Sequence, residues 1–380
     1  MHPKFILGLY IFITLLASIL QVLKNHPDSS WTSYNNYLIF KTSFQHLVSG
    51  GDLYQLWPSD HQDYYKYSPL FALLIAPFSA LNIMTGLCIW NLINALTLYF
   101  AIFQIKHLSQ KAKVFILLFI LLELLTSIQN SQSNGLMTAL MIFAFNKMES
   151  GKSLMANLLL SLAFFIKIFS LAGFILLLLY PNKIKSILYA ALCMGFLFFL
   201  PLLAVSYSQL IFLYGSWIKL LSNDHSASIG LSVMGFFQTW FALDINKSLL
   251  AIIGMILLLL PLIRIKQYVF MSYRMLILAS VLIWVIIFNH KAESPTFIVA
   301  MSGVAIWYFS EKRNRMDLIL LILTFVFTSL SPTDLFPKYI RMHLVIPYVL
   351  KAVPCIIIWG KILWELMTKD FGKQLKIASE

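Results

Sequence analysis

The sequence has little charge. Only 11% of its 380 residues are charged and 60% are hydrophobic, whereas soluble domains carry about 25% charged residues. Apolar stretches of membrane-spanning length recur from end to end, which excludes a soluble globular protein and predicts an integral membrane protein. The runs are continuous and do not alternate with polar residues, so they predict an all-α polytopic fold rather than a β-barrel.

Cysteine and acidic residues are also scarce. The three cysteines, Cys88, Cys193 and Cys355, lie far apart in apolar runs, so we expect neither a disulfide nor a zinc site. No compact cluster of metal ligands is visible, and we expect no cofactor and no required metal. The 28 basic residues outnumber the 15 acidic ones. They form short clusters between apolar runs instead of one stripe, which argues against a nucleic-acid partner and indicates membrane topology.

The apolar runs define one integral membrane domain over residues 1–380. We expect the first run to be a retained helix, with a cleaved signal peptide as the alternative. The run 67–105 would reach about 60 Å as one helix, against a hydrocarbon core of about 30 Å, so we expect it to divide near Asn82. The runs cover residues 4–23, 67–105, 114–127, 134–147, 153–180, 186–206, 248–264, 274–289, 296–310, 316–330 and 341–364.

The run 153–180 carries Lys167 in its middle. It can form one overlong helix or a hairpin with Lys167 at its tip. The excess of positive charge on cytoplasmic loops favours the hairpin. If the run were one helix, every cation from Lys183 onward would lie on the opposite side of the membrane from the N-terminus. The cations that the hairpin gathers on one side are Lys106, Lys111, Lys113, Lys147, Lys152, Lys183, Lys185, Arg264, Lys266, Arg274, Lys312, Arg313, Arg315, Lys369, Lys373 and Lys376.

The hairpin predicts about 12 transmembrane helices in the cytoplasmic (inner) membrane, with both termini cytoplasmic. It places the long loops, about 24–66 and 207–247, on the outer face, together with 127–133, 290–295 and 331–340. In the first loop, side chains at helical spacing predict an amphipathic helix on the outer face; they are Tyr37, Phe40, Phe44 and Leu47, before Gly50 and Gly51. The acids of these outer segments are Asp28, Asp52, Asp60, Asp63, Asp224, Asp244, Glu293 and Asp334.

Lys167 is the first candidate functional residue. A lysine at the bilayer centre costs several kcal/mol, so this one either snorkels to the interface or meets an anion. The segment "SIQNSQSNG" (127–135) would hold Gln132 and Asn134 at the same outer depth, although a bare connector can look the same.

Two further groups of polar residues accompany it. In the first loop, Tyr64, Tyr65, Lys66 and Tyr67 follow Asp60 and Asp63. They form either an interfacial aromatic belt or a site for a sugar joined to a lipid phosphate, because rings pack on sugar faces, carboxylates accept from hydroxyls and a cation meets the phosphate. The turn "NHKAESP" supplies His290, Lys291 and Glu293, and such a turn is commonly only solvated.

Glu123 is an acid inside a span. It either pairs with a lysine or stays protonated, and the sequence assigns it no function.

These segments together resemble a known family. "YKYSPLFALLIAPFSAL", "NSQSNGLMTALMIFAF" and "LAFFIKIFS" are similar, in this order, to motifs of the membrane glycosyltransferases of the C superfamily, most closely glycosyltransferase family 87, the polyprenyl-phosphate-mannose-dependent family. The resemblance covers nearly the whole chain and places Gln132, Asn134 and Lys167 on family positions. Ser68 and Ser170 stand where the family has proline, and Ser131 where it has glycine.

The family carries an aspartate ahead of the first outer helix that is taken to be the general base. Counting back from "GGDLY", the matching residue here is Asn36. An amide cannot accept a proton at neutral pH. Three explanations are therefore open. Asp52, Asp60 or Asp63 acts as the general base, or the acceptor differs from that of the family, or the chain is catalytically impaired.

The resemblance implies transfer of a sugar, mannose most commonly, from a polyprenyl phosphate to an acceptor hydroxyl of a glycan or glycolipid on the outer side, with inversion. Lys167 with Lys66 or Lys291 would bind the phosphate. The sugar or acceptor would lie among Asn36, Tyr64, Tyr65, Tyr67, Gln132, Asn134 and Glu293.

Two alternatives remain open. A transporter or flippase for lipid-linked sugar would also gather cations and aromatics around a membrane cavity, although the sequence shows no convincing internal repeat of the kind that transporters often carry. A non-catalytic relative that binds lipid-linked sugar is the other alternative, motivated by Asn36.

Overall fold

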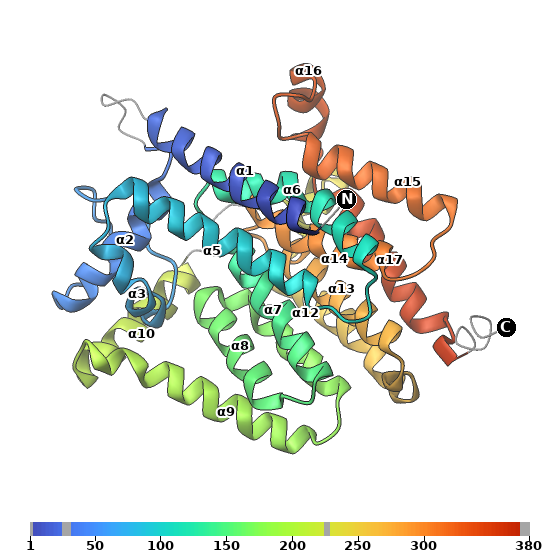
Figure 1. The fold of residues 1–380 in the computed structure, drawn as a ribbon, viewed down its shortest axis with the longest axis horizontal. Helices are drawn as coiled ribbons and strands as arrows, with labels where there is room; N and C mark the ends of the chain where they lie inside the picture. The colour runs from blue at the N-terminus through green and yellow to red at the C-terminus, as the bar shows by residue number, and fades with distance from the viewer. Residues whose placement is uncertain (1–2, 25–31, 224–228, 373–380) are drawn as a thin grey trace.

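The computed structural model describes residues 3–24, 32–223 and 229–372 (Figure 1). Within these ranges the regular elements are all helices, as the apolar pattern predicts. Two of the outer-segment acids, Asp28 and Asp224, and two of the cations in the topology argument, Lys373 and Lys376, lie outside the described ranges.

The first half of the chain supplies the helices around the predicted hairpin. They are α1 (Pro3–Leu23), α2 (Asn35–Val48), α3 (Pro69–Leu74), α4 (Ala76–Ser79), α5 (Ile83–Phe103), α6 (Gln110–Gln129), α7 (Asn134–Glu149), α8 (Ser153–Ile166) and the 3-10 helix η1 (Ile168–Leu179).

The second half is more broken. Its elements are α9 (Lys183–Phe199), η2 (Leu200–Leu203), α10 (Tyr207–Asn223), α11 (Val233–Phe241), α12 (Lys247–Leu259), η3 (Leu260–Ile263), η4 (Ile265–Val269), α13 (Met271–Ile287), η5 (Ser294–Thr296), α14 (Phe297–Phe309), α15 (Arg315–Thr324), the π-helix η6 (Phe325–Leu330), α16 (Lys338–Ile340), the π-helix η7 (Arg341–Val345) and α17 (Val353–Thr368).

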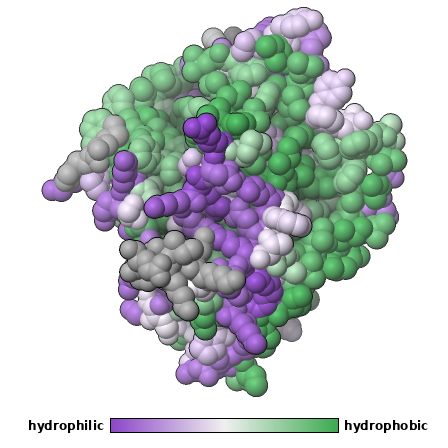
Figure 2. All heavy atoms as spheres, turned by 90° about the vertical axis from the view of Figure 1, so that its right-hand side faces the viewer, coloured by the Kyte–Doolittle hydropathy of each residue, from purple (hydrophilic) through white to green (hydrophobic). Residues whose placement is uncertain are grey.

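The helices have the lengths and surfaces of a membrane protein. Among the described residues, 4 helices are long and apolar enough to cross a bilayer, namely Pro3–Leu23, Ile83–Phe103, Gln110–Gln129 and Lys183–Leu203. Figure 2 shows a hydrophilic patch bordered by broad hydrophobic surface on the side of the molecule where Figure 1 marks the C-terminus. This pattern fits a protein with an apolar belt, and the number of spans stays a prediction.

The division of the long run at Asn82 is confirmed. The Asn82 side chain accepts a hydrogen bond from the Thr85 backbone N–H at 2.9 Å and so caps α5. The two short helices α3 and α4 precede the cap, and α5 begins at Ile83.

The helix break at Lys167 is also present. Lys167 is extended, with φ −142° and ψ 115°, and separates α8 from η1. A Cβ on Gly173 of η1 would lie 2.9 Å from Leu160 Cδ2 of α8, so the two arms pack closely against each other. At about 1.5 Å and 2.0 Å per residue, α8 and η1 reach about 21 and 24 Å, which is less than the hydrocarbon thickness of about 30 Å. Each arm by itself is therefore too short to span the core.

The helix expected in the first loop is α2. Tyr37, Phe40 and Leu47 are buried, Phe44 is half-buried, and the helix ends before Gly50, which has a φ of +77°. Its position on the outer face stays a prediction. The buried Tyr37 hydroxyl packs against Gly86, where any side chain would clash with it. This contact holds α2 against the start of α5.

The run 341–364 differs from the expected single span. Residues 341–345 are π-helical, Val349 adopts a positive φ of 52°, and a regular α-helix begins only at Val353. Just before this helix, Lys351 ties the irregular segment to the helices around it. Its Nζ donates to Glu123 Oε1 and to the Thr328 carbonyl, both at 2.6 Å, and forms a buried ion pair with Glu123. Glu123 thus has the lysine partner that was one of the two alternatives for it.

We expect Lys351→Met to destabilise the protein strongly, because it leaves the carboxyl group of Glu123 buried without its ion-pair partner. Breaking a buried pair typically costs about 3–5 kcal/mol, whereas replacing both partners is far less costly. The double variant Glu123→Gln with Lys351→Met should therefore recover most of the loss, as thermal unfolding of the detergent-solubilised protein will measure. Equal melting temperatures for the single and double variants would contradict this account.

Candidate functional site

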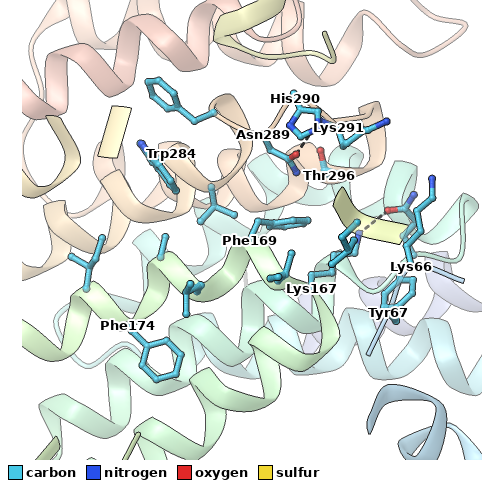
Figure 3. A pocket seen from close by; sticks show the side chains of 18 of the residues that line it. Lys66, Tyr67, Lys167, Phe169, Phe174, Trp284, Asn289, His290, Lys291 and Thr296 are labelled. Carbon is cyan, nitrogen blue, oxygen red and sulfur yellow. Dashed lines mark hydrogen bonds between the residues drawn. The ribbon is translucent and has the colours of Figure 1, made fainter. Parts of the chain in front are cut away.

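The polar residues of the first loop, the Lys167 break and the turn after α13 meet at one pocket of about 1060 Å³. Lys66, Lys167 and Lys291 all line it. Figure 3 shows Lys66, Tyr67 and Lys167 on one side of this pocket and His290 and Lys291 on the other. Residues more than 200 positions apart in the sequence therefore converge on one polar end.

Amide oxygens fix the Lys167 side chain. Its Nζ donates to Asn134 Oδ1 at 2.7 Å and to Gln132 Oε1 at 3.2 Å. Asn134 Nδ2 in turn donates to the Pro295 carbonyl and to Gln132 Oε1, both at 2.8 Å. Since amides accept hydrogen bonds without carrying charge, this arrangement orients the ammonium group and leaves its positive charge available.

Burial also acts on the charge of Lys167, which lies in the break outside both helices. Desolvation lowers the pKa of Lys167 to about 8, and the nearby charge of Glu293 opposes this shift. The ammonium form thus predominates at neutral pH but is readily lost in base. An anion bound beside the side chain would restore a higher pKa.

The first loop supplies Asp63, Tyr64, Lys66 and Tyr67 to the pocket. The Asp63 carboxylate lies 4.0 Å from Lys66 Nζ. The Tyr67 ring stacks on Phe71 and lies 5.8 Å from Lys167 Nζ, within cation–π range. Tyr65 does not line the pocket, because it is buried and its hydroxyl donates to the Ser68 carbonyl at 2.8 Å.

Two of the candidate bases lie away from the pocket lining. Asp52 accepts from the Tyr54 backbone N–H at 3.0 Å and from Ser216 Oγ at 3.3 Å. Asp60 contacts His46 Nε2 at 2.7 Å, and the His46 ring stacks on Trp57. Both acids therefore hold the shape of the loop, whereas Asp63 faces the pocket.

The opposite wall is the turn between α13 and α14. Asn289, His290, Lys291, Glu293 and Thr296 line the pocket from this side. Gln132 Nε2 lies 3.4 Å from Glu293 Oε2, so the wall is connected to the amides that hold Lys167. Asp63 and Glu293 are the carboxylates that line the pocket among the residues the structure describes.

Asn36 lines the pocket from the first turn of α2. Its Nδ2 donates to the Asn130 carbonyl at 2.8 Å. An aspartate could not donate this hydrogen bond, so the asparagine suits its own surroundings. In the structure Asn36 anchors the end of α6 to α2.

An apolar arm of the pocket, not expected from the sequence, runs along η1 toward Lys183. With three residues per turn, side chains three apart eclipse each other and form straight columns. Both columns that face the pocket are apolar, Ile168, Leu171, Phe174 and Leu177 beside Phe169, Ala172, Ile175 and Leu178. Trp284 of α13 lines the same arm. Phe288, the residue that follows α13, also lines it. A search for 3.6-residue periodicity cannot find columns with a period of three.

No group of three or more His, Cys, Asp or Glu that could hold a metal occurs among the residues that the structure describes. The expectation of metal independence stays a prediction.

We expect Lys167 to react with an amine-specific reagent at unusually low pH. Neutral amines react, so labelling should rise as pH passes about 8, whereas an ordinary lysine requires a pH near 10.4. Mass spectrometry of the labelled peptides will give the pH profile, with a free lysine-containing peptide as reference. A Lys167 profile that matches that of the free peptide would contradict the lowered pKa.

Comparison with known proteins identifies the family of this chain. A search of curated proteins finds no match. The model of glycosyltransferase family 87 matches residues 65–332, a range that includes Lys66, Tyr67, Gln132, Asn134, Lys167, Lys291 and Glu293. Because the match covers most of the chain, this protein belongs to glycosyltransferase family 87 and is a membrane glycosyltransferase by family.

Proposed function

We propose that the protein transfers a sugar, mannose in the first instance, from a polyprenyl phosphate to an acceptor hydroxyl, with inversion at the anomeric carbon. The proposal includes the predicted topology, in which the polar end of the pocket faces the outside of the cytoplasmic membrane. The acceptor is a glycan or glycolipid.

The observation that carries this proposal is the continuity of the pocket. Its polar end has three lysines, and its other arm is a straight apolar channel along η1. A ligand that matches both parts has an anionic group joined to a long hydrocarbon tail, as a lipid-linked sugar has. A soluble sugar nucleotide would leave the apolar arm unused.

In this arrangement Lys167 contacts the phosphate of the donor, with Lys66 and Lys291 nearby. As the bond between the anomeric carbon and the phosphate oxygen breaks, negative charge grows on the leaving polyprenyl phosphate. A positive charge already fixed by Gln132 and Asn134 stabilises that charge without reorganisation. The sugar then lies against Tyr67, Tyr64 and Asn36.

The acceptor oxygen attacks the anomeric carbon from the face opposite the phosphate, and a carboxylate takes its proton. Asp63 is the first choice for this base because it lines the pocket, adjoins Tyr64 and belongs to the loop named from the sequence. Glu293, on the opposite wall, is the second. The base passes its proton to solvent after the sugar is transferred.

We expect Lys167→Met to abolish sugar transfer in proteoliposomes supplied with polyprenyl-phosphate mannose and an acceptor. Loss of the cation removes stabilisation of the leaving phosphate and should lower the rate by about a hundredfold or more. Lys167→Arg keeps the charge and should retain part of the activity. Full activity of the methionine variant would exclude a phosphate role, and movement of intact donor across the bilayer without transfer would favour a transporter instead.

The carboxylate assignment has matched controls in the same loop. Asp63→Asn should reduce the rate of transfer by about a hundredfold or more, whereas Asp52→Asn and Asp60→Asn should affect stability more than turnover. Glu293→Gln tests the second choice in the same assay.

Retained activity in both Asp63→Asn and Glu293→Gln would place the base elsewhere. Transfer that appears only in Asn36→Asp would identify the natural chain as a non-catalytic binder of lipid-linked sugar.

A further inference from the structure

A second cavity, of about 570 Å³, lies at the far end of η1 from Lys167. We call it the distal cavity. It is formed where the end of α7, the segment 179–183, η4 and the start of α13 meet; its lining is Met148, Glu149, Gly151, Leu179, Tyr180, Pro181, Lys183, Ile265, Tyr268, Val269 and Arg274. The proposed transfer reaction uses none of its polar groups.

The lining of this cavity carries a net positive charge. Arg274 forms a bidentate pair with Glu149, with Nε to Oε1 at 2.6 Å and Nη2 to Oε2 at 2.8 Å. The Tyr180 hydroxyl also donates to Glu149. These contacts satisfy the carboxylate and neutralise the arginine, so the remaining charge is that of Lys183.

Lys183 is oriented toward the cavity by an aromatic ring. Its Nζ lies 5.6 Å from the centroid of the Tyr268 ring. The ring is itself held, because the Tyr268 hydroxyl donates to the Leu262 carbonyl at 2.5 Å and its own carbonyl accepts from Arg274 Nη1 at 2.6 Å. Among the residues that the structure describes, Lys183 forms no ion pair with a carboxylate.

The surroundings of the cavity are apolar and exposed. Ile265 and Val269 of η4 line it and are 63% and 73% exposed. Ile184 and Ile187, beside Lys183 on α9, are also exposed. A net positive charge bordered by apolar surface in a membrane protein fits an amphiphile with an anionic headgroup, because a soluble anion would make no use of that surface.

We propose that the distal cavity binds an anionic phospholipid, with its phosphate at Lys183 and its acyl chains against Ile265 and Val269. Two more lysines adjoin the lining residues, since Lys152 follows Gly151 and Lys266 follows Ile265. They add positive potential around the headgroup. This site is separate from the polar end of the main pocket and does not depend on the proposed transfer reaction.

The test uses the purified full chain in neutral detergent, without sugar donor, titrated with phosphatidylglycerol. Native mass spectrometry measures bound lipid, and thermal unfolding measures stabilisation. Lys183→Gln should weaken phosphatidylglycerol binding by about fivefold and remove most of the thermal shift. Lys185→Gln is the matched control, because Lys185 lies two residues away, contacts the Tyr189 ring and is outside the cavity lining. It should bind lipid as the unmodified chain does.

A second variant avoids any effect of Lys183 on the main pocket, which it also lines. Val269→Glu adds a negative charge at an exposed position of the distal cavity and should reduce binding, whereas Ile263→Glu, exposed but outside the lining, should not. Equal binding by all four variants would overturn the proposal. So would an equal thermal shift from phosphatidylcholine, which indicates a neutral lipid, or from inorganic phosphate alone, which indicates a soluble anion.

Discussion

The hydrogen bonds from Lys167 to two amide oxygens are the interaction on which the site depends. A carboxylate in place of Asn134 or Gln132 would hold the lysine equally well but would neutralise it, and an incoming anion would then have to compete with a fixed one. Asn134 is itself held by the Pro295 carbonyl, and Pro295 follows the turn that carries Lys291 and Glu293. One small network therefore positions the cation and links the two walls of the pocket.

Local hydrogen bonds accompany three positions at which this chain departs from the family pattern, and two of them, at Ser68 and Ser170, lie beside the break at Lys167. Ser68 caps α3 and also donates to the Phe165 carbonyl near the end of α8 at 2.5 Å. Ser170 donates from its backbone N–H and its hydroxyl to the Lys167 carbonyl, at 3.0 and 2.8 Å. Ser131 has a φ of 51°, a conformation that glycine adopts without strain. In each case the serine hydroxyl forms a hydrogen bond that proline or glycine cannot form. For Ser131, Oγ accepts from Gln21 Nε2 at 3.0 Å.

Much of this arrangement could be predicted from the sequence. Continuous apolar runs predicted helices, the charge distribution favoured a break at Lys167, and a shared predicted depth placed Gln132 and Asn134 near the lysine. The choice among acids could not be predicted, because Asp52, Asp60 and Asp63 share a loop and only the folded loop shows which one faces the pocket. The pairing of Glu123 with Lys351 joins residues 228 positions apart, and no local pattern reports it. The distal cavity is formed by elements that are far apart in the sequence and come together only in the folded chain.

The 3-10 form of η1 has a consequence for how the hydrocarbon tail of the proposed donor would be recognised. In an α-helix the side chains facing a groove drift around the axis, so a long ligand would meet a different set at each turn. In η1 the two columns stay parallel to the axis. A hydrocarbon chain bound along η1 would therefore meet repeating, nearly equivalent neighbours at successive positions. Such a surface favours hydrocarbon over water while being nearly insensitive to register, which leaves discrimination among ligands to the charged end.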